Sequence, residues 1–168
     1  NRGEFKNKIA IIGGGPAGLS CAYYLALTGY RPIVFEKNEK PGGMLTYGIP
    51  SYKLEKDVVE AEIDIIRALG VEIKCGVEVG KDITLDELRK DGYEAFYIAI
   101  GCQGSRKSGV DGEDADGVMS AVDILHEIAE NHDLNLKGNK TVVIGGGNVA
   151  VDVARSTKRC GADVLGMF

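Results

Sequence analysis

One stretch decides the fold: Lys8-Ile9-Ala10-Ile11-Ile12-Gly13-Gly14-Gly15-Pro16-Ala17-Gly18, in which an apolar run of strand length leads through glycines into a helical pattern. The first turn of a helix offers unpaired N–H groups and the positive end of the helix dipole, which together bind anions such as pyrophosphate. Gly13 permits the tight turn, Gly15 the close approach of phosphate, and Gly18 the packing of helix on sheet. The stretch predicts a strand over residues 8–12 and a pyrophosphate loop. A helix follows over residues 16–28 and ends at Gly29.

An acidic residue stands where such a loop needs one. The dinucleotide-binding fingerprint places an acid at the end of the second strand, about 20 residues after the first glycine, where it binds a ribose hydroxyl. Glu36 occupies that place, at the end of an apolar strand predicted over residues 31–36. Strand, helix and strand in so short a span form a βαβ unit with parallel strands and a right-handed crossover. We therefore expect an α/β protein with a Rossmann-like fold.

A second glycine loop reads Gly145-Gly146-Gly147-Asn148-Val149-Ala150, between a strand predicted over residues 141–144 and a helix over residues 148–160. It matches the variant of the fingerprint in which alanine replaces the third glycine. The residue that chooses between a ribose hydroxyl and a 2′-phosphate is expected beyond Phe168, so NADH and NADPH both remain open. A last strand from residue 163 barely closes this second unit, and we expect a longer protein of which this chain is a fragment.

Between the two loops the pattern alternates between helices and strands. A polar loop containing Pro41-Gly42-Gly43 and Gly48-Ile49-Pro50 precedes an amphipathic helix over residues 54–69, which Gly70 ends. Thr84 and Glu87 form a capping box for a short helix. The remaining predicted elements are a strand over residues 71–79 with a turn or bulge at Gly76, a strand over 93–100, a loop over 102–117 and a helix over 120–131.

Composition excludes several classes of partner. The net charge of −5 without a basic run disfavours nucleic acid and anionic membrane surfaces. No apolar stretch approaches the ~20 residues of a membrane span, and no signal peptide is evident, so a cytoplasmic protein is expected. The four cysteines form no C-x-x-C pair, and buried free thiols are expected rather than a metal site. His126 and His132 are expected on helix surfaces, and no catalytic residue is evident.

Several motifs resemble a known family. Two dinucleotide loops at this spacing look like the two-dinucleotide flavoproteins, among which the spacing alone admits disulfide reductases. The segment Gly42-Gly43-Met44-Leu45-Thr46-Tyr47-Gly48-Ile49-Pro50 resembles more narrowly the small (beta) subunit of NADPH-dependent glutamate synthase and the flavin domain of dihydropyrimidine dehydrogenase. The strand end at Tyr97-Ile98-Ala99-Ile100-Gly101 and the helix Asn148-Val149-Ala150-Val151-Asp152-Val153-Ala154-Arg155 are similar to the same family.

The resemblance implies FAD at the first loop and NADPH or NADH at the second. It implies an FAD-binding domain over residues 1–136, with 102–136 as connecting loop and helix, and the truncated beginning of an NAD(P)-binding domain over 137–168. It also implies iron–sulfur clusters outside this chain and electron transfer to a large glutamate-synthase-type subunit or another electron-accepting subunit or domain. By position, the cofactor-binding residues would be Gly13, Gly14, Gly15, Pro16, Ala17, Gly18, Glu36, Lys37, Gly43, Met44, Lys53 (a cation towards the flavin), Val79 (backbone at the adenine), Gly101, Gly145, Gly146, Gly147 and Asn148.

Three functions therefore compete. The first is an FAD-dependent oxidoreductase that passes hydride from NAD(P)H to FAD as an electron-input module, although the isolated fragment is expected to be inactive. The second is a dinucleotide-binding module or fragment without turnover. The third is a pyridine-nucleotide disulfide reductase, which a C-x-x-C beyond Phe168 would favour.

Overall fold

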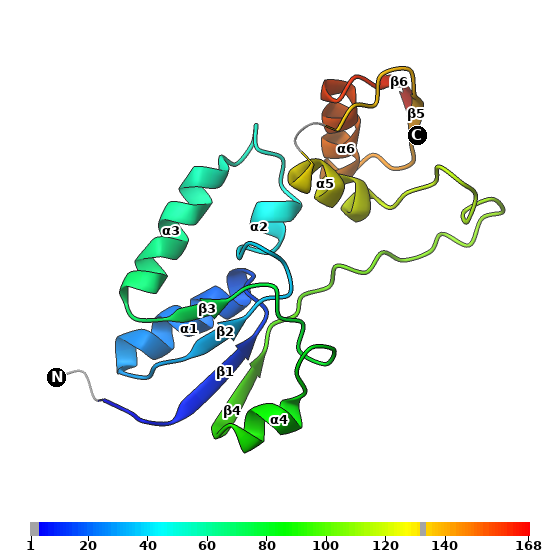
Figure 1. The fold of residues 1–168 in the computed structure, drawn as a ribbon. Helices are drawn as coiled ribbons and strands as arrows, with labels where there is room; N and C mark the ends of the chain where they lie inside the picture. Colours follow the sequence, from blue (N-terminus) through cyan, green and yellow to red (C-terminus); the bar gives the residue numbers. More distant parts are fainter. Residues whose placement is uncertain (1–3, 132–133) are drawn as a thin grey trace. The chain divides into compact units, whose positions relative to one another are not determined.

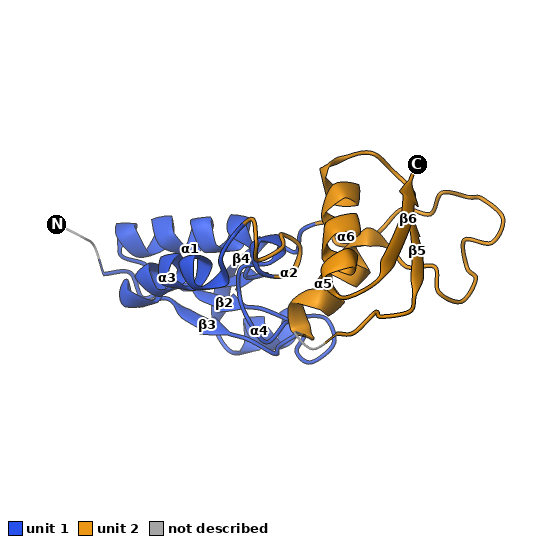
Figure 2. Ribbon diagram, turned by 90° about the horizontal axis from the view of Figure 1, so that it is seen from above, with its two compact units in different colours: residues 1–46, 54–101 blue, residues 47–53, 102–168 orange. Residues whose placement is uncertain are grey.

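The computed structural model describes residues 4–131 and 134–168, which form two compact units (Figures 1 and 2). Unit 1 runs to Thr46 and resumes from Leu54 to Gly101, whereas unit 2 contains Tyr47–Lys53 and Cys102–Phe168. The elements that begin in unit 1 are β1 (Lys8–Ile12), α1 (Pro16–Thr28), β2 (Ile33–Phe35), α2 (Met44–Tyr47), α3 (Lys56–Ala68), β3 (Glu72–Lys74), α4 (Leu85–Lys90) and β4 (Tyr93–Ile98). Unit 2 adds α5 (Ala121–Glu130), β5 (Lys140–Val143), α6 (Asn148–Arg159) and β6 (Asp163–Met167).

Unit 1 is built on a parallel sheet with strand order β3-β2-β1-β4. The placement of β1 in its interior confirms the predicted βαβ unit, because α1 connects β1 to its parallel neighbour β2. The residues of β1 from Ile9 to Ile12 are all buried, as expected for a strand covered on both faces. The α/β, Rossmann-like fold predicted from the sequence is confirmed.

Successive residues of β1 point to opposite faces of the sheet, and each face has its own core (Figure 1). Ile11 packs with Ala22 and Ala26 of α1 on the face that also receives apolar residues of α3. Ala10 and Ile12 pack with Leu88 of α4 on the other face. The carboxyl end of β1, from which the first glycine loop leaves, is therefore held from both sides.

The ends of α1 follow from its sequence. Pro16 is the first helical residue, where a missing N–H costs nothing. Gly29 ends the helix in the left-handed conformation, with φ 104°, and donates its N–H to Ala26 O. The capping box of α4 is present as predicted, since the Thr84 hydroxyl accepts the Glu87 N–H and the Glu87 carboxylate accepts the Thr84 N–H.

Unit 2 pairs β5 with β6 in parallel, and α5 and α6 share its core. Val143 of β5 packs there with Ile124 and Leu125 of α5 and with Ala150 and Val153 of α6. The predicted strand, glycine loop, helix and strand are thus all present in order. The domain division predicted at residue 136 concerns cofactor domains and stays a prediction. In the structure, the described residues from Cys102 onward group with Tyr47–Lys53.

Several predicted bounds differ from the structure by one or two residues, among them the strand predicted over residues 31–36, which is Ile33–Phe35, and larger differences concern three segments. The strand predicted over residues 71–79 is only Glu72–Lys74, because Gly76 turns the chain with φ 69°. The strand predicted over residues 93–100 ends at Ile98. Residues 44–47, expected within a loop, form the short helix α2. None of the helices in the described residues is long and apolar enough to cross a membrane.

Candidate functional site

The first glycine loop leaves β1 through a turn that requires glycine. Gly13 has φ 109°, a backbone conformation that side chains rarely adopt, and its N–H donates to Phe35 O at 2.8 Å. A Cβ at this position would overlap the carbonyl oxygen of Ala99, which follows β4. The turn is therefore locked between the ends of β2 and β4, and Gly13 has the steric role that the sequence predicts.

The other two glycines of the fingerprint differ in their surroundings. A Cβ on Gly18 would overlap the Gly13 carbonyl oxygen and lie 3.1 Å from Cγ2 of Ile11, so the helix packs on the loop and the strand at that point. A Cβ on Gly15 would find only the Gly43 Cα, at 3.8 Å. The backbone of Gly15 is thus open where a phosphate has to approach, and this opening is the cradle that a side chain would fill.

The helices that follow the two glycine loops begin without a cap. Gly15 and Gly147 are the N-cap residues of α1 and α6, neither helix start receives a side-chain hydrogen bond, and neither has an acid in its first turn. By contrast, Thr84 and Ser120 cap α4 and α5, and α3 has Asp57 in its first turn. The uncapped N–H groups at α1 and α6 are therefore available to an anionic ligand.

Glu36 is a buried carboxylate beside the first loop. It is 4% exposed, its Oε2 accepts the Gly14 N–H at 2.7 Å, and its Oε1 accepts the Asn38 N–H at 2.9 Å. An ionised carboxylate has about four lone-pair sites, so these two bonds leave capacity for ribose hydroxyls. Glu36 therefore fits the ribose-binding role predicted for it and also fixes the loop.

The sequence did not predict a role for Asn38, which lies close to Glu36 in the chain. Nδ2 of Asn38 is buried and has no hydrogen-bond partner among the described residues, which is unusual because buried polar atoms are normally paired. It lies two residues beyond Glu36, and the exposed Lys37 stands between them. In the sequence, only the position of this amide, two residues after the fingerprint acid Glu36, could have indicated a role for Asn38. The unpaired donor fits a hydroxyl-bearing ligand at this end of the sheet.

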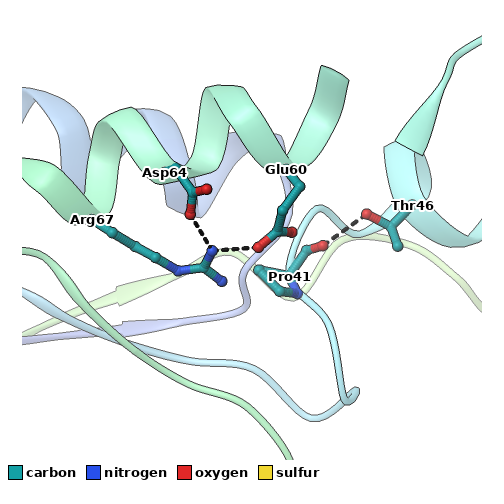
Figure 3. Close-up of polar contacts among 5 residues, drawn as sticks. All are labelled: Pro41, Thr46, Glu60, Asp64 and Arg67. Carbon is teal, nitrogen blue, oxygen red and sulfur yellow. Dashed lines mark hydrogen bonds and ion pairs between the residues drawn. The ribbon is translucent and has the colours of Figure 1, made fainter. Parts of the chain in front are cut away.

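A second glycine pair closes against the first loop. The Gly42 N–H donates to Gly14 O at 2.7 Å, and a Cβ on Gly43, whose φ is 54°, would come within 2.9 Å of the Gly15 Cα. Thr46 holds this approach, because its hydroxyl donates to Pro41 O at 2.7 Å (Figure 3). The backbone around Gly42 and Gly43 therefore meets the first glycine loop.

Figure 3 also shows Arg67 of α3, which pairs with Glu60 and with Asp64 on its own helix. The hydrogen bond to Glu60 raises the pKa of Arg67, with a smaller contribution from Asp64. The Arg67 guanidinium is therefore already paired with two carboxylates of its own helix.

The second loop has the same design in a looser form. Gly145 has φ 126°, and a Cβ there would meet the Ala150 Cβ at 3.6 Å, an ordinary contact. A Cβ on Gly146 or Gly147 would meet nothing within 4 Å. The alanine at the packing position is therefore accommodated, and the backbone before Asn148 is open to a ligand.

The remaining predicted residues lie apart from the two loops in the chain. Val79 forms an isolated parallel bridge with Ile83 and packs on the core beneath α4. Gly101 follows β4 and is exposed, with φ 69°. Lys53 belongs to unit 2, where its ammonium pairs with Asp152 of α6. The cofactor contacts assigned to these three residues stay predictions.

The segment around Lys53 makes a set of contacts that the sequence analysis missed. The guanidinium carbons of Arg155 and Arg159 lie 4.6 Å and 4.0 Å from the centre of the Tyr52 ring, which is the range of a cation–π contact. The Tyr52 hydroxyl lies 3.5 Å from Oδ1 of Asp152. Asp152, Arg155 and Arg159 recur at helical spacing, so they form one stripe on α6, hereafter the α6 stripe.

Burial disfavours the thiolate form of three of the four cysteines, and the described residues contain no cluster of potential metal ligands. Burial raises the pKa of the Cys21 and Cys160 thiols, and burial followed by the charge of Glu36 raises that of Cys75, so all three disfavour the reactive thiolate. No group of three potential metal ligands occurs among residues 4–131 and 134–168. His126 is partly buried, stacks on the Tyr47 ring with 4.5 Å between centroids, and His132 lies outside the described residues.

Comparison with known proteins finds similarity to oxidoreductases. Residues 7–166 match the family model described as pyridine nucleotide-disulphide oxidoreductase. The chain is 48% identical to the NADP(+)-dependent formate dehydrogenase subunit beta of Moorella thermoacetica and 40% identical to the glutamate synthase [NADPH] small chain of Escherichia coli. Both alignments cover 92% of this chain but only 22% and 35% of the relatives.

A solved structure agrees with these relatives. FprA of Mycobacterium tuberculosis in complex with NADPH superposes with a TM-score of 0.76 at 28% identity, over 89% of this chain and 36% of that one. The chain therefore spans about a fifth to about a third of the length of the proteins it matches.

Proposed function

The chain belongs to the pyridine nucleotide-disulphide oxidoreductase family, and from this premise we propose that it is the flavin-reducing part of an electron-input module. In this module hydride passes from NADPH or NADH to FAD. The chain is an oxidoreductase module with a dinucleotide-binding fold, related to the glutamate synthase small chain and to formate dehydrogenase subunit beta. The buried Glu36, bonded to the Gly14 N–H beside an uncapped helix, is the observation that carries the proposal.

We assign FAD to the first loop and the nicotinamide dinucleotide to the second. The first loop has the complete fingerprint, with the open backbone at Gly15 and the acid Glu36. It also receives the loop around Gly43, one of the residues that the resemblance assigns to cofactor binding. The second loop has an uncapped helix and open backbone at Gly147, as a second pyrophosphate would need.

In this scheme the residues of the chain bind and orient the two dinucleotides. The amides of Ala17 and Gly18 and the α1 dipole would hold the FAD pyrophosphate, while Glu36 and the Asn38 amide would bind the adenosine ribose. The amides at the start of α6 would hold the second pyrophosphate. When bound, FAD supplies the hydride-accepting chemistry, and the protein supplies placement and electrostatics. Lys53 is assigned as a cation presented to the flavin.

Two matched valine variants of the full-length protein test the assignment of the loops. Gly15→Val and Gly147→Val place the same side chain at the same point of each fingerprint. The backbone is extended at both positions, with φ −79° and −81°, and a Cβ meets nothing closer than 3.8 Å. Both variants are therefore expected to fold. The wild-type protein should be purified yellow and should bleach when NADPH is added without oxygen.

The two variants should fail in different ways. Gly15→Val should lose FAD, because the side chain fills the approach to the phosphates. Gly147→Val should keep FAD and remain reducible by dithionite but not by NADPH. A colourless wild-type protein that cannot be reconstituted with FAD would contradict the proposed function. Loss of FAD from Gly147→Val alone would reverse the assignment of the loops.

The electron donor and the electron acceptor belong to the same proposal. NADPH is the expected donor, since the names of both relatives above contain NADP(+) or NADPH. Both relatives are named as a subunit or a small chain, which supports transfer of electrons to a partner subunit, with iron–sulfur centres outside this chain as the route. Reduction rates with NADPH and NADH under identical conditions would decide the donor.

A further inference from the structure

Helix α3 carries two apolar lines, and only one of them packs in the described core of unit 1. Val59 and Ile63 are buried and pack with Leu19 of α1, which lies beside α3 (Figure 1). A helix that packs on one side needs only one such line. The members of the second line are exposed and recur at i, i+3, i+7 and i+10, and they form what we call the α3 stripe: Val58, Ala61, Ile65 and Ala68.

The α3 stripe has the shape of a surface that receives another helix. Val58 and Ile65 are 50% and 52% exposed and lie one heptad apart. An alanine follows each of them after three residues, so large and small side chains alternate along the line. Such alternation allows the side chains of a facing helix to interdigitate. From Val58 to Ala68 the helix rises roughly 15 Å, which is enough to contact about three turns of that facing helix.

Acidic side chains flank the α3 stripe on both sides. Glu62 lies on one side, and Asp57 and Asp64 lie on the other. Each of the three is three or four residues from a member of the stripe, which is the spacing of neighbours on a helix surface. Neither Asp57 nor Glu62 has an ion pair with any residue that the structure describes.

The basic residues of α3 are already engaged. The ammonium of Lys56 donates to Leu45 O at 2.8 Å, and Arg67 pairs with Glu60 and Asp64 (Figure 3). No other lysine or arginine occurs in this helix. The α3 stripe is therefore an apolar line with a negatively charged rim.

This charge pattern selects the kind of occupant. A second copy of the chain would bring two acidic rims together, and an anionic membrane surface would repel the rim, because like charges across an interface are unfavourable. A helix with lysine or arginine beside its own apolar residues is complementary in both shape and charge.

We propose that the α3 stripe docks an amphipathic helix of the partner subunit, in which lysine or arginine flanks the apolar residues. The inference rests on the proposed function only in expecting a partner subunit, and it needs neither FAD nor NADPH. A stable interface buries about 800 Å² on each partner, so this helix contact is one part of a larger interface. The test must therefore report on the local contact.

Photo-crosslinking on the full-length protein provides such a test. The photoreactive residue p-benzoylphenylalanine, placed at position 65 in cells that also make the partner subunit, should crosslink to a peptide of a different polypeptide. That peptide should have apolar residues at helical spacing with lysine or arginine beside them. The same photoreactive residue at position 86 of α4 is the matched control and should not capture this peptide, although the Asp86 side chain is 80% exposed.

Charge reversal tests the acidic rim. Glu62→Lys should lower the crosslinking yield at position 65 roughly five- to tenfold, because attraction to the basic helix is replaced by repulsion. Asp116→Lys changes the net charge equally at an exposed loop residue of unit 2 and should leave the yield unchanged. Both substitutions are at exposed positions without an ion pair in the described chain, so an unchanged thermal unfolding curve is expected for each.

The outcomes separate the inference from the proposed function. The inference is overturned by the absence of a crosslink at position 65, by a crosslink within this chain or to a second copy of it, or by capture of a peptide without basic residues. Equal yields in Glu62→Lys and the unreversed protein would also overturn it. A protein that is yellow and bleaches with NADPH, but gives no crosslink, keeps the proposed function and loses only the docking surface. A colourless protein that gives the expected crosslink does the reverse.

Discussion

Replacement of Gly18 by alanine brings two effects of opposite sign into competition. Alanine is the better helix former by about 1 kcal/mol. The added Cβ would, however, overlap the Gly13 carbonyl oxygen and come within 3.1 Å of Cγ2 of Ile11. Overpacking costs about 1–3 kcal/mol, and the upper end applies because the overlapped oxygen belongs to a locked backbone turn. We expect a net destabilisation of unit 1 by about 2 kcal/mol.

Hydrogen exchange measured by mass spectrometry on the full-length protein can isolate this effect. Peptides from β1 and α1 should exchange roughly 30-fold faster in Gly18→Ala, while peptides from α6 should be unaffected. Gly104→Ala is the matched control, because Gly104 lies in a loop where a Cβ meets nothing within 4 Å. Unchanged or slower exchange in β1 and α1 would refute the steric argument, since helix propensity would then outweigh the overlap.

Two further predictions concern carboxylates. Glu36→Gln puts an amide NH₂ group against the N–H donor of Gly14 or of Asn38. Titration of the apoprotein with FAD should therefore show an affinity that is lower roughly tenfold or more. An unchanged Kd would exclude the ribose role of Glu36. Hydrogen bonds from the Thr84 amide and then from the Thr84 hydroxyl lower the pKa of Glu87, so its capping of α4 is complete at neutral pH and is lost as the pH falls through the lowered pKa. Amide protection of α4 should therefore decline on acidification in the wild type but not in Glu87→Gln, and identical pH profiles would contradict this.

The features predicted well are those with local causes. The bounds of α1 could be predicted, because proline favours the first helical position and glycine the left-handed cap, and Pro16 and Gly29 occupy these positions. The capping box of α4 is likewise a pattern four residues long. The steric roles of Gly13 and Gly18 could be assigned because the fingerprint specifies where backbone must turn or approach closely.

The features missed depend on contacts between distant residues. Helix α2 is too short to be stable alone and is held by the Thr46 to Pro41 bond and by the contact of Gly42 with Gly14. The orphaned amide of Asn38 becomes visible only once the loops have packed around it. The sequence pattern of the α6 stripe does not identify Tyr52 as its partner. Charged residues at helical spacing usually face solvent, so the pattern predicts no packed contact.

The packing of Tyr47–Lys53 into unit 2 also has a consequence for synthesis. The ribosome makes Tyr52 100 residues before Asp152, which lies 3.5 Å from it in the folded protein. At about 5–20 residues per second, that interval is roughly 5–20 s. Unit 1 has its last strand once Gly101 has been made, so its sheet can form while this segment still lacks its partner helix. The exposed Tyr47 and Tyr52 rings would then be a binding target for chaperones, until α5 packs on Tyr47 and α6 on Tyr52.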